Sequence, residues 1–291
     1  MKLALTKGES KVAKPEPMIF THYDIEWCLY DQKRLVEYQA AIHKKCKDKV
    51  VVDVGAGTGV LSLFAAQAGA KRVYAVEINP RAAKIIGHNA ARNGFGDIIR
   101  VIHGDGMEVD IPEKADVVTC DLLCCGLFFE PEIQVMNNAK RYLKPGGTFI
   151  PEDVESRVEL IAAETHTYGL RLDYLNRATH LPGDHALTEA VLYNHSHFAE
   201  NLSGWIDGDV MLTATASGVA NAIRTTGRAK LADGIYTGHT TSLFNPETIF
   251  LREPIAVTRG CQYRVKLHYL GGGDPTEAQI SVAEIAAEAA A

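Results

Sequence analysis

Apolar runs of strand length alternate with segments of helical period over the first half of the chain. Strands are predicted at VVVDV (50–54), RVYAV (72–76), IIRVIH (98–103), ADVVTC (115–120) and TFI (148–150). Helices are predicted at 24–45, 60–68, 80–93 and 132–143, and KPGG (144–147) predicts a turn. Because strands that alternate with helices form parallel sheets, this half predicts a Rossmann-like α/β sheet with helices on both faces.

The pattern changes after Pro151. Strand-like runs follow one another with no long helical period between most of them, and helical candidates remain only within 165–202. We therefore expect a first domain at 24–150 and a β-rich domain at 151–275. Residues 1–23 predict a loose polar arm. The Ala- and Glu-rich residues 276–291 predict a tail that is a frayed helix or a disordered end.

Charge and hydropathy narrow the class of protein. The 291 residues carry a formal net charge of -6, with a pI of about 6.0, which argues against broad binding to nucleic acid or anionic membranes. We find no uninterrupted apolar stretch long enough to span a bilayer, and MKLALTKGES is too short a segment for a secretory signal. We therefore expect a cytoplasmic protein with no nucleic-acid or membrane partner.

Cysteine and histidine spacing does not suggest a metal site. The six cysteines have no metal-ligand spacing, and we expect them to be reduced and mostly buried. The pair His195 and His197, with His185 nearby, has no matching set of cysteines or aspartates close in sequence. We therefore expect no metal.

The segment VVVDVGAGTGVLSLF places glycines between a predicted strand and a predicted helix, where a ligand can approach the main chain. A dinucleotide fingerprint requires glycine where Val60 or Ser62 stands, and no G-K-[ST] follows for a P-loop. Glu77 ends the next strand, where a carboxylate can accept both hydroxyls of a ribose. HGDGME (103–108) follows the third strand. Tight packing alone is the other explanation of such a turn.

The stretch TCDLLCCGLFFEPE (119–132) brackets apolar residues with two acids, Asp121 and Glu130. It follows the fourth strand, so it emerges at the carboxyl edge of the sheet beside the glycine loop. Paired carboxylates can orient a cationic or N–H-bearing substrate and accept its proton. The alternatives are that Asp121 caps a turn and that Glu130 begins the next helix. Cys124 and Cys125 have no histidine close in sequence to activate them, so we interpret them as small pocket-wall residues.

Residues 24–160 resemble the catalytic half of the protein arginine methyltransferases, which have a class I methyltransferase sheet. The similarity is carried by DQKRLVEYQAAI (31–42), KDKVVVDVGAGTGVLSLFAAQAGAKRVYAVE (47–77), YLKPGGTFIPE (142–152) and the spacing of the two acids. It implies S-adenosylmethionine as cofactor, a barrel-like β domain, and Asp121 and Glu130 as catalytic residues. The cofactor-binding residues that it implies are Arg34, Asp53, Gly55, Gly57, Glu77, Ile78, Gly106 and Met107.

Several positions depart from that family. Its first loop acid is Glu, whereas Asp121 is one methylene shorter, and Leu-Leu-Cys-Cys replaces a Trp-Met-Gly-Tyr run. Its late Thr-His-Trp loop falls on residues 242–244, which lack histidine, and His239 is the nearest substitute. Its dimerisation arm, within 165–200, looks shorter or altered. We also interpret Tyr23, Trp27 and Cys124 as substrate-binding, although simple helix packing is the alternative for the two aromatic residues.

These departures predict a biosynthetic methyltransferase that acts on a nitrogen or carbon of a small molecule of the indole or guanidine type. The alternative hypothesis is a protein arginine N-methyltransferase. A third is a cofactor-binding partner subunit that has lost catalysis. The sequence leaves homodimerisation open.

Overall fold

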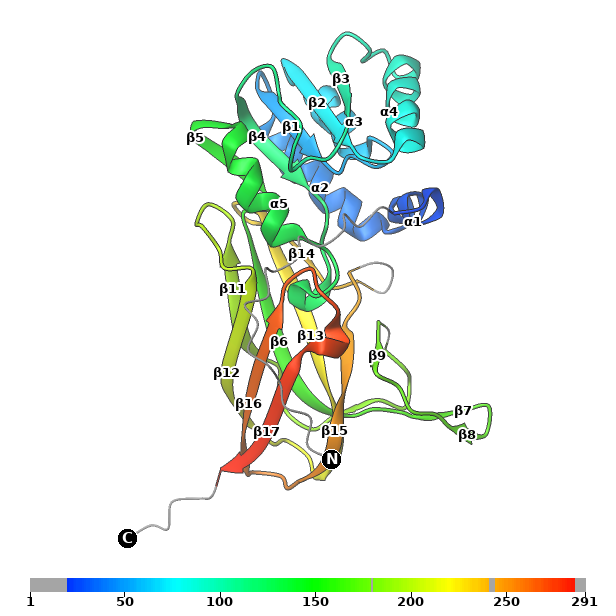
Figure 1. Cartoon of the computed structure of the whole chain (residues 1–291), viewed down its shortest axis with the longest axis vertical. Coiled ribbons are helices and arrows are strands. Elements are labelled where there is room, and N and C mark those ends of the chain that lie inside the picture. Colours follow the sequence, from blue (N-terminus) through cyan, green and yellow to red (C-terminus); the bar gives the residue numbers. More distant parts are fainter. Residues whose placement is uncertain (1–19, 179, 241–243, 286–291) are drawn as a thin grey trace, which may run out of the picture.

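A computed structural model describes residues 20–178, 180–240 and 244–285. The molecule is elongated, with a helix-flanked parallel sheet at one end and a long antiparallel β domain at the other (Figure 1). Most of the expected N-terminal arm lies outside the described residues. Within the described ranges, no helix combines the length and apolar character that a membrane span requires.

The first unit is a five-stranded sheet of order β3-β2-β1-β4-β5 with every pairing parallel. Its strands are β1 (Val50–Val54), β2 (Arg72–Glu77), β3 (Ile99–His103), β4 (Ala115–Cys120) and β5 (Leu143–Ile150). All five residues of β1 are buried, as expected for a central strand covered on both faces. The chain order reverses between β1 and β4, which creates a switch point where ligands bind in sheets of this kind. The predicted α/β fold with a β-rich second unit is confirmed.

Helices flank this sheet as predicted, with one interruption. They are α1 (His22–Trp27), α2 (Gln32–Lys45), α3 (Val60–Gln67), α4 (Pro80–Arg92) and α5 (Glu132–Ala139), with short 3-10 turns η1 (Cys28–Tyr30) and η3 (Lys140–Tyr142). The prediction of a single helix over 24–45 was wrong, because α1, η1 and α2 occupy this range. Asp31 breaks it because its backbone is not helical and its side chain accepts a hydrogen bond from Arg34 N–H, which starts α2.

The second unit is built from two antiparallel sheets. The larger contains β6 (Asp153–Ala162), β9 (Asn176–Arg177), β10 (His185–Ala186), β11 (Val191–His197), β13 (Gly218–Ala232), β14 (Ile235–Gly238) and β15 (Glu247–Val257). The smaller contains β12 (Trp205–Thr213), β16 (Gln262–Leu270) and β17 (Gln279–Ile285). Alternate residues of β16 are buried, so each strand contributes one face to the core that both units share.

Three local predictions were wrong, each because long-range pairing decides the structure. KPGG (144–147) is not a turn but part of β5, which pairs with β4. Residues 165–178 and 180–202 contain no helix and instead contribute short strands. The expected tail contains η4 (Pro275–Glu277) and β17, which pairs with β16 from Gln262 to His268.

A hairpin of β7 (His166–Thr167) and β8 (Leu170–Arg171) projects sideways from the β domain (Figure 1). A buried ion pair fixes its base, because Arg177 Nη2 lies 2.6 Å from both carboxylate oxygens of Asp184. Asp184 also accepts hydrogen bonds from the backbone N–H groups of Glu164 and Leu181. The projecting part is therefore anchored to the rigid sheet.

Candidate active site

The glycine loop and the acid at the end of β2 form one unit. Gly55 and Gly57 adopt left-handed φ values of 72° and 57°. Glu77 accepts a hydrogen bond from Gly57 N–H at 2.7 Å and another from Asn79 N–H at 2.7 Å. The carboxylate is thus positioned against the loop where a ribose would lie.

Asp53, at the end of β1, is buried directly before the glycines. The hydroxyl of Ser62 donates to its Oδ2 at 2.6 Å, whereas its Oδ1 has no hydrogen-bond partner. Burial raises the pKa of Asp53 to about 7, although the Ser62 hydrogen bond opposes the rise. An unsatisfied buried acceptor next to the loop fits a site that receives a polar, positively charged ligand.

Ile78, Gly106 and Met107 lie at the same edge of the sheet, because Glu77 pairs with His103 across β2 and β3. A Cβ on Gly106 would lie 2.6 Å from Val54 Cγ1, so packing against the end of β1 also requires glycine there. Met107 N–H donates to Asp105 Oδ1 at 2.8 Å, which orders this loop. Their roles as cofactor contacts remain predictions.

Arg34, in the first turn of α2, reaches the segment 119–132 that follows β4, which we call the acid loop. Its side chain is 3% exposed, and its Nη1 lies 3.4 Å from Asp121 Oδ1. Its Nε and Nη2 make no hydrogen bond. A buried guanidinium with unused donors fits the carboxylate group of the cofactor, as the resemblance implied. Arg34 and Asp53 both have buried polar atoms without a hydrogen-bond partner, which fits the binding of S-adenosylmethionine at the carboxyl ends of the strands.

The acid loop contains three carboxyl groups rather than the expected two. Glu132, at the start of α5, is fully buried, and neither of its side-chain oxygens has a partner. Burial and the charge of Asp121 raise the pKa of Glu130 to about 8 and hold that of Glu132 well above its usual range. Burial also raises the pKa of Asp121, while Arg34 lowers it. The motif E-P-E at 130–132 was the available signal for Glu132.

Tyr38 is a second residue that sequence reasoning missed as part of the site. It lies one helical turn after Arg34, and its hydroxyl donates to the carbonyl oxygen of Cys120 at 3.0 Å. The same hydroxyl lies close enough to Asp121 to favour its ionised form. Its helical spacing from Arg34 was the only available signal.

Side chains of the β domain pack against the acid loop, and one of them donates a hydrogen bond to it. The rings of Phe128 and Tyr269 stack with centroids 4.1 Å apart, and Tyr269 Oη donates to the carbonyl of Gly126 at 2.7 Å. Tyr193 Oη lies 2.7 Å from Tyr269 Oη. Gly126 has a φ of 74°, and a Cβ there would lie 2.3 Å from the Phe128 ring, so the turn requires glycine. The loop geometry therefore depends on both units.

Cys124 is buried beside the acids, and its Sγ accepts a hydrogen bond from Glu130 N–H at 3.5 Å. Burial and the charge of Glu130 raise its thiol pKa. The group is a neutral thiol that lines the loop, in line with the interpretation as a wall residue.

The other expected substrate contacts lie around the start of α2. Tyr23 and Trp27 are 66% and 59% exposed, so helix packing does not account for them. His239 is exposed after β14, and its neighbour Thr240 donates from Oγ1 to Asp31 Oδ2 at 2.6 Å. Residues 242 and 243 of the expected late loop lie outside the described residues.

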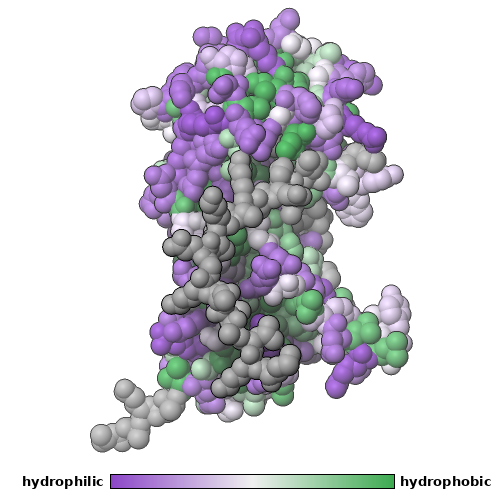
Figure 2. Space-filling model, viewed as in Figure 1, coloured by the Kyte–Doolittle hydropathy of each residue, from purple (hydrophilic) through white to green (hydrophobic). Residues whose placement is uncertain are grey.

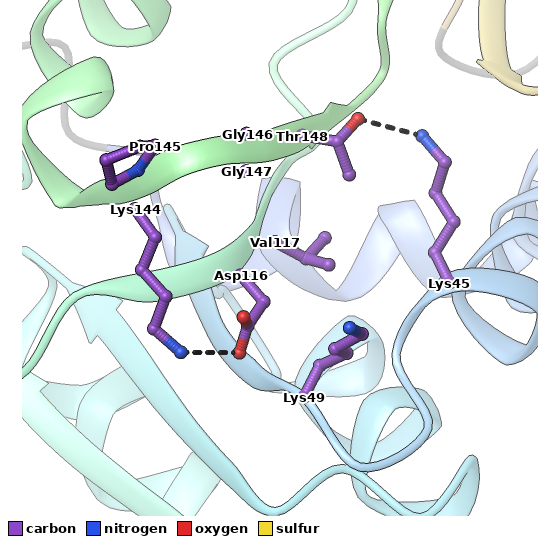
Figure 3. Close-up of a pocket in the computed structure, with 9 residues that line it drawn as sticks. All are labelled: Lys45, Lys49, Asp116, Val117, Lys144, Pro145, Gly146, Gly147 and Thr148. Carbon is purple, nitrogen blue, oxygen red and sulfur yellow. Dashed lines mark hydrogen bonds and ion pairs between the residues drawn. The ribbon is translucent and has the colours of Figure 1, made fainter.

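A small pocket near the opposite edge of the sheet is separate from this site (Figure 3). Asp116 stands at the start of β4, whereas Asp121 follows its end. Lys144 Nζ pairs with Asp116 Oδ2 at 2.9 Å, and Lys45 Nζ donates to Thr148 Oγ1 at 3.1 Å. Lys45, Lys144 and Asp116, which line this pocket, are therefore already paired with partners of the chain itself.

Comparison with known proteins agrees with the fold and with a methyltransferase. The family model of the ribosomal protein L11 methyltransferase (PrmA) matches residues 22–173. An uncharacterized protein of Methanocaldococcus jannaschii is 37% identical over 151 residues, which cover 50% of this chain and 56% of that protein. A probable protein arginine N-methyltransferase 1.2 of Arabidopsis thaliana is 39% identical over 150 residues, or 49% of this chain and 40% of that protein. The chain thus spans about half the length of these relatives.

The Trypanosoma brucei PRMT1 enzyme–prozyme heterotetrameric complex with AdoHcy superimposes with a TM-score of 0.78. The superposition covers 92% of this chain and 95% of that chain at 21% identity, so it speaks for the fold. Fold, glycine loop and acid loop together define a class I S-adenosylmethionine-dependent methyltransferase, which confirms the predicted class and cofactor. By the model that matches more than half of its residues, the chain belongs to the ribosomal protein L11 methyltransferase family.

We expect Glu77→Ala to weaken S-adenosylmethionine binding by about ten- to a hundredfold, because a hydrogen bond to a charged group contributes roughly 1.5–3 kcal/mol. Isothermal calorimetry measures the affinity. Glu113→Ala is the matched control. Glu113 accepts a hydrogen bond from Tyr74 Oη and pairs with Arg72, and Arg72 begins β2 at the edge of the sheet opposite to Glu77. Equal affinity in Glu77→Ala would exclude this carboxylate from the cofactor site.

We expect the cofactor-free protein to lose stability as the pH rises from 5 to 8. Glu130 titrates near 4.5 when unfolded and at about 8 when folded, so its stabilising contribution is complete below pH 4.5 and is lost through pH 8. Glu130→Gln should reduce the loss by up to about 3 kcal/mol in denaturant unfolding. Glu253→Gln removes an exposed acid as the control. An unchanged slope in Glu130→Gln would mean that Glu130 is already ionised at neutral pH.

Proposed function

We propose that this protein transfers a methyl group from S-adenosylmethionine to a guanidinium nitrogen of arginine in a protein substrate. One observation carries the proposal: Asp121, Glu130 and Glu132 lie in one largely buried cluster, in which Arg34 makes an ion-pair contact with Asp121. Such a cluster is short of positive charge. A cationic acceptor restores the balance by charge-assisted hydrogen bonds.

The chemistry follows from the positions of the acids. Bound S-adenosylmethionine supplies an activated methyl group on a sulfonium. The S–CH3 bond breaks as the N–CH3 bond forms, and the nitrogen loses one proton. Glu130, once the positive charges of cofactor and acceptor lower its pKa from about 8 and ionise it, takes that proton, while Asp121 and Arg34 fix the geometry.

The relatives support a protein substrate. The matching family and the Arabidopsis relative are both named for methylation of proteins. A second candidate, a small indole or guanidine compound, is favoured by the acid loop itself. Asp121 is short and lies against Arg34, and Cys124 gives the loop a small apolar wall. Both candidates share the cofactor and the acids.

The deciding experiment offers labelled S-adenosylmethionine with an arginine-rich peptide, free arginine, and a panel of indoles and amines. We expect label on the peptide. Label on free arginine or an indole but not on the peptide would favour the small-molecule candidate. No transfer to any acceptor, with cofactor still bound, would favour a partner subunit without catalysis. In the active reaction, Glu130→Gln should lose about a hundredfold or more of turnover and keep cofactor affinity, with Glu253→Gln unchanged.

We also infer that two copies associate through the β7–β8 hairpin. Figure 2 shows apolar surface on this projection, where Tyr168 is 95% exposed and Leu170 62%. Leu175, close by, is 74% exposed. Clustered apolar side chains on a rigid projection are typical of interaction sites.

We expect the double substitution Tyr168→Asn with Leu170→Thr to convert a dimer into a monomer in analytical ultracentrifugation. Asparagine tolerates the left-handed backbone at residue 168, where φ is 56°, so the hairpin should keep its shape. Val219→Ser, at a 56% exposed position on β13, is the control. A monomeric wild type, or a dimer that survives the double substitution, would contradict this inference.

A further inference from the structure

Two histidines and an aspartate gather on the outer face of the β domain, away from the acid loop. Strands β6 and β11 pair antiparallel, and their register sets His197 opposite Asp153 and His195 opposite Glu155. Neighbouring Val154 and Ser196 are buried, so the alternating side chains of this set point outward. Local spacing could not suggest the set, because Asp153 comes from a different strand.

The donor atoms converge on one point. His195 Nε2 lies 3.1 Å from Asp153 Oδ1, and His197 Nδ1 lies 3.7 Å from Asp153 Oδ2. The two imidazole rings have centroids 3.9 Å apart, and one donor atom from each residue lies within 4.8 Å of the others. A single carboxylate therefore faces two imidazoles through different oxygens.

The surroundings leave this carboxylate available. Lys230 lies opposite Asp153 on β13, but its Nζ pairs with Glu152 at 2.7 Å and with Asp233 at 3.1 Å. The side chains of His195 and His197 are 34% and 47% exposed, which gives an ion access from solvent.

We propose that Asp153, His195 and His197 bind a divalent first-row transition ion, with zinc as the best match. Zinc takes imidazole nitrogen and carboxylate oxygen at about 2.0–2.2 Å, and two histidines with one carboxylate leave a position for water or another ligand. The expectation of no metal considered only ligands close in sequence, whereas Asp153 comes from the neighbouring strand β6.

An ion here would cross-link β6 to β11 beside the junction of the two units. Glu152, the preceding residue, binds Lys45 of α2 at 2.5 Å and Lys230 of β13 at 2.7 Å. The metal therefore stabilises the start of the β domain. The proposal does not depend on which acceptor is methylated.

The test uses untagged full-length protein carrying Cys28→Ser and Cys261→Ser, because those two thiols are partly accessible and could bind metal themselves. Calorimetry with Zn²⁺ and with Ni²⁺ should give one ion per chain. The melting temperature should rise on addition of metal and return with a chelator.

Asp153→Asn, His195→Ala and His197→Ala should each weaken binding at least tenfold while circular dichroism stays unchanged. The matched control is His268→Ala, because His268 Nδ1 pairs with Asp207 at 2.7 Å without a second histidine ligand. If one histidine variant does not fold, the metal affinity of Asp153→Asn decides the test. Absence of binding, or binding that Asp153→Asn leaves unchanged, would overturn the proposal.

Discussion

The cluster of largely buried acids around one guanidinium is the constraint on which the rest of the site depends. Asp121 contacts Arg34 directly, and the charge of Asp121 also acts on Glu130 and Glu132. Removing carboxylates from water costs several kcal/mol each unless a partner compensates. Here one guanidinium cannot compensate three acids, and burial together with the charge of Asp121 raises the pKa of Glu130. The site is therefore organised for positive charge, which both a sulfonium and a cationic acceptor carry.

The two units are tied together at this cluster, so the β domain is part of the active site rather than an addition to it. Tyr269 of β16 donates a hydrogen bond to the turn at Gly126. Thr240, which follows β14, donates a hydrogen bond to Asp31, the residue that caps α2. Arg34 follows that acid by one helical turn. A shift of the β domain would therefore move both the cation and the carboxylates. Precise placement of this kind is what in-line transfer requires.

The sequence predicted β1 to β4 to within one residue, helped by central strands β1, β2 and β4 that are short, apolar and almost fully buried, whereas β5 was predicted only at 148–150. The run at 50–54 coincides with β1. Prediction failed where pairing with a distant strand decides the structure, as at β17 (QISVAEI), which was expected to be part of a frayed or disordered tail but whose backbone pairs with β16. The glycine loop and the two acids were visible as motifs. Glu132 and Tyr38 left only weak signals in the sequence, and nothing in the sequence joined Asp153 to His195 and His197, because burial and strand register bring these residues together.

The shortened acid at position 121 can be understood from its partner. A glutamate would extend one methylene further, whereas Asp121 lies 3.4 Å from Arg34 and is 12% exposed. Because Arg34 also has unused donors, it can hold Asp121 and the cofactor's carboxylate at the same time. In the proposed reaction, contact with the acceptor then falls mainly to Glu130, next to the fully buried Glu132. An acceptor held by fewer direct carboxylate contacts still gains from the surrounding negative charge, since attraction in a buried site extends beyond hydrogen-bond distance. A short Asp121 is therefore compatible with a guanidinium acceptor, and its length alone does not exclude protein-bound arginine.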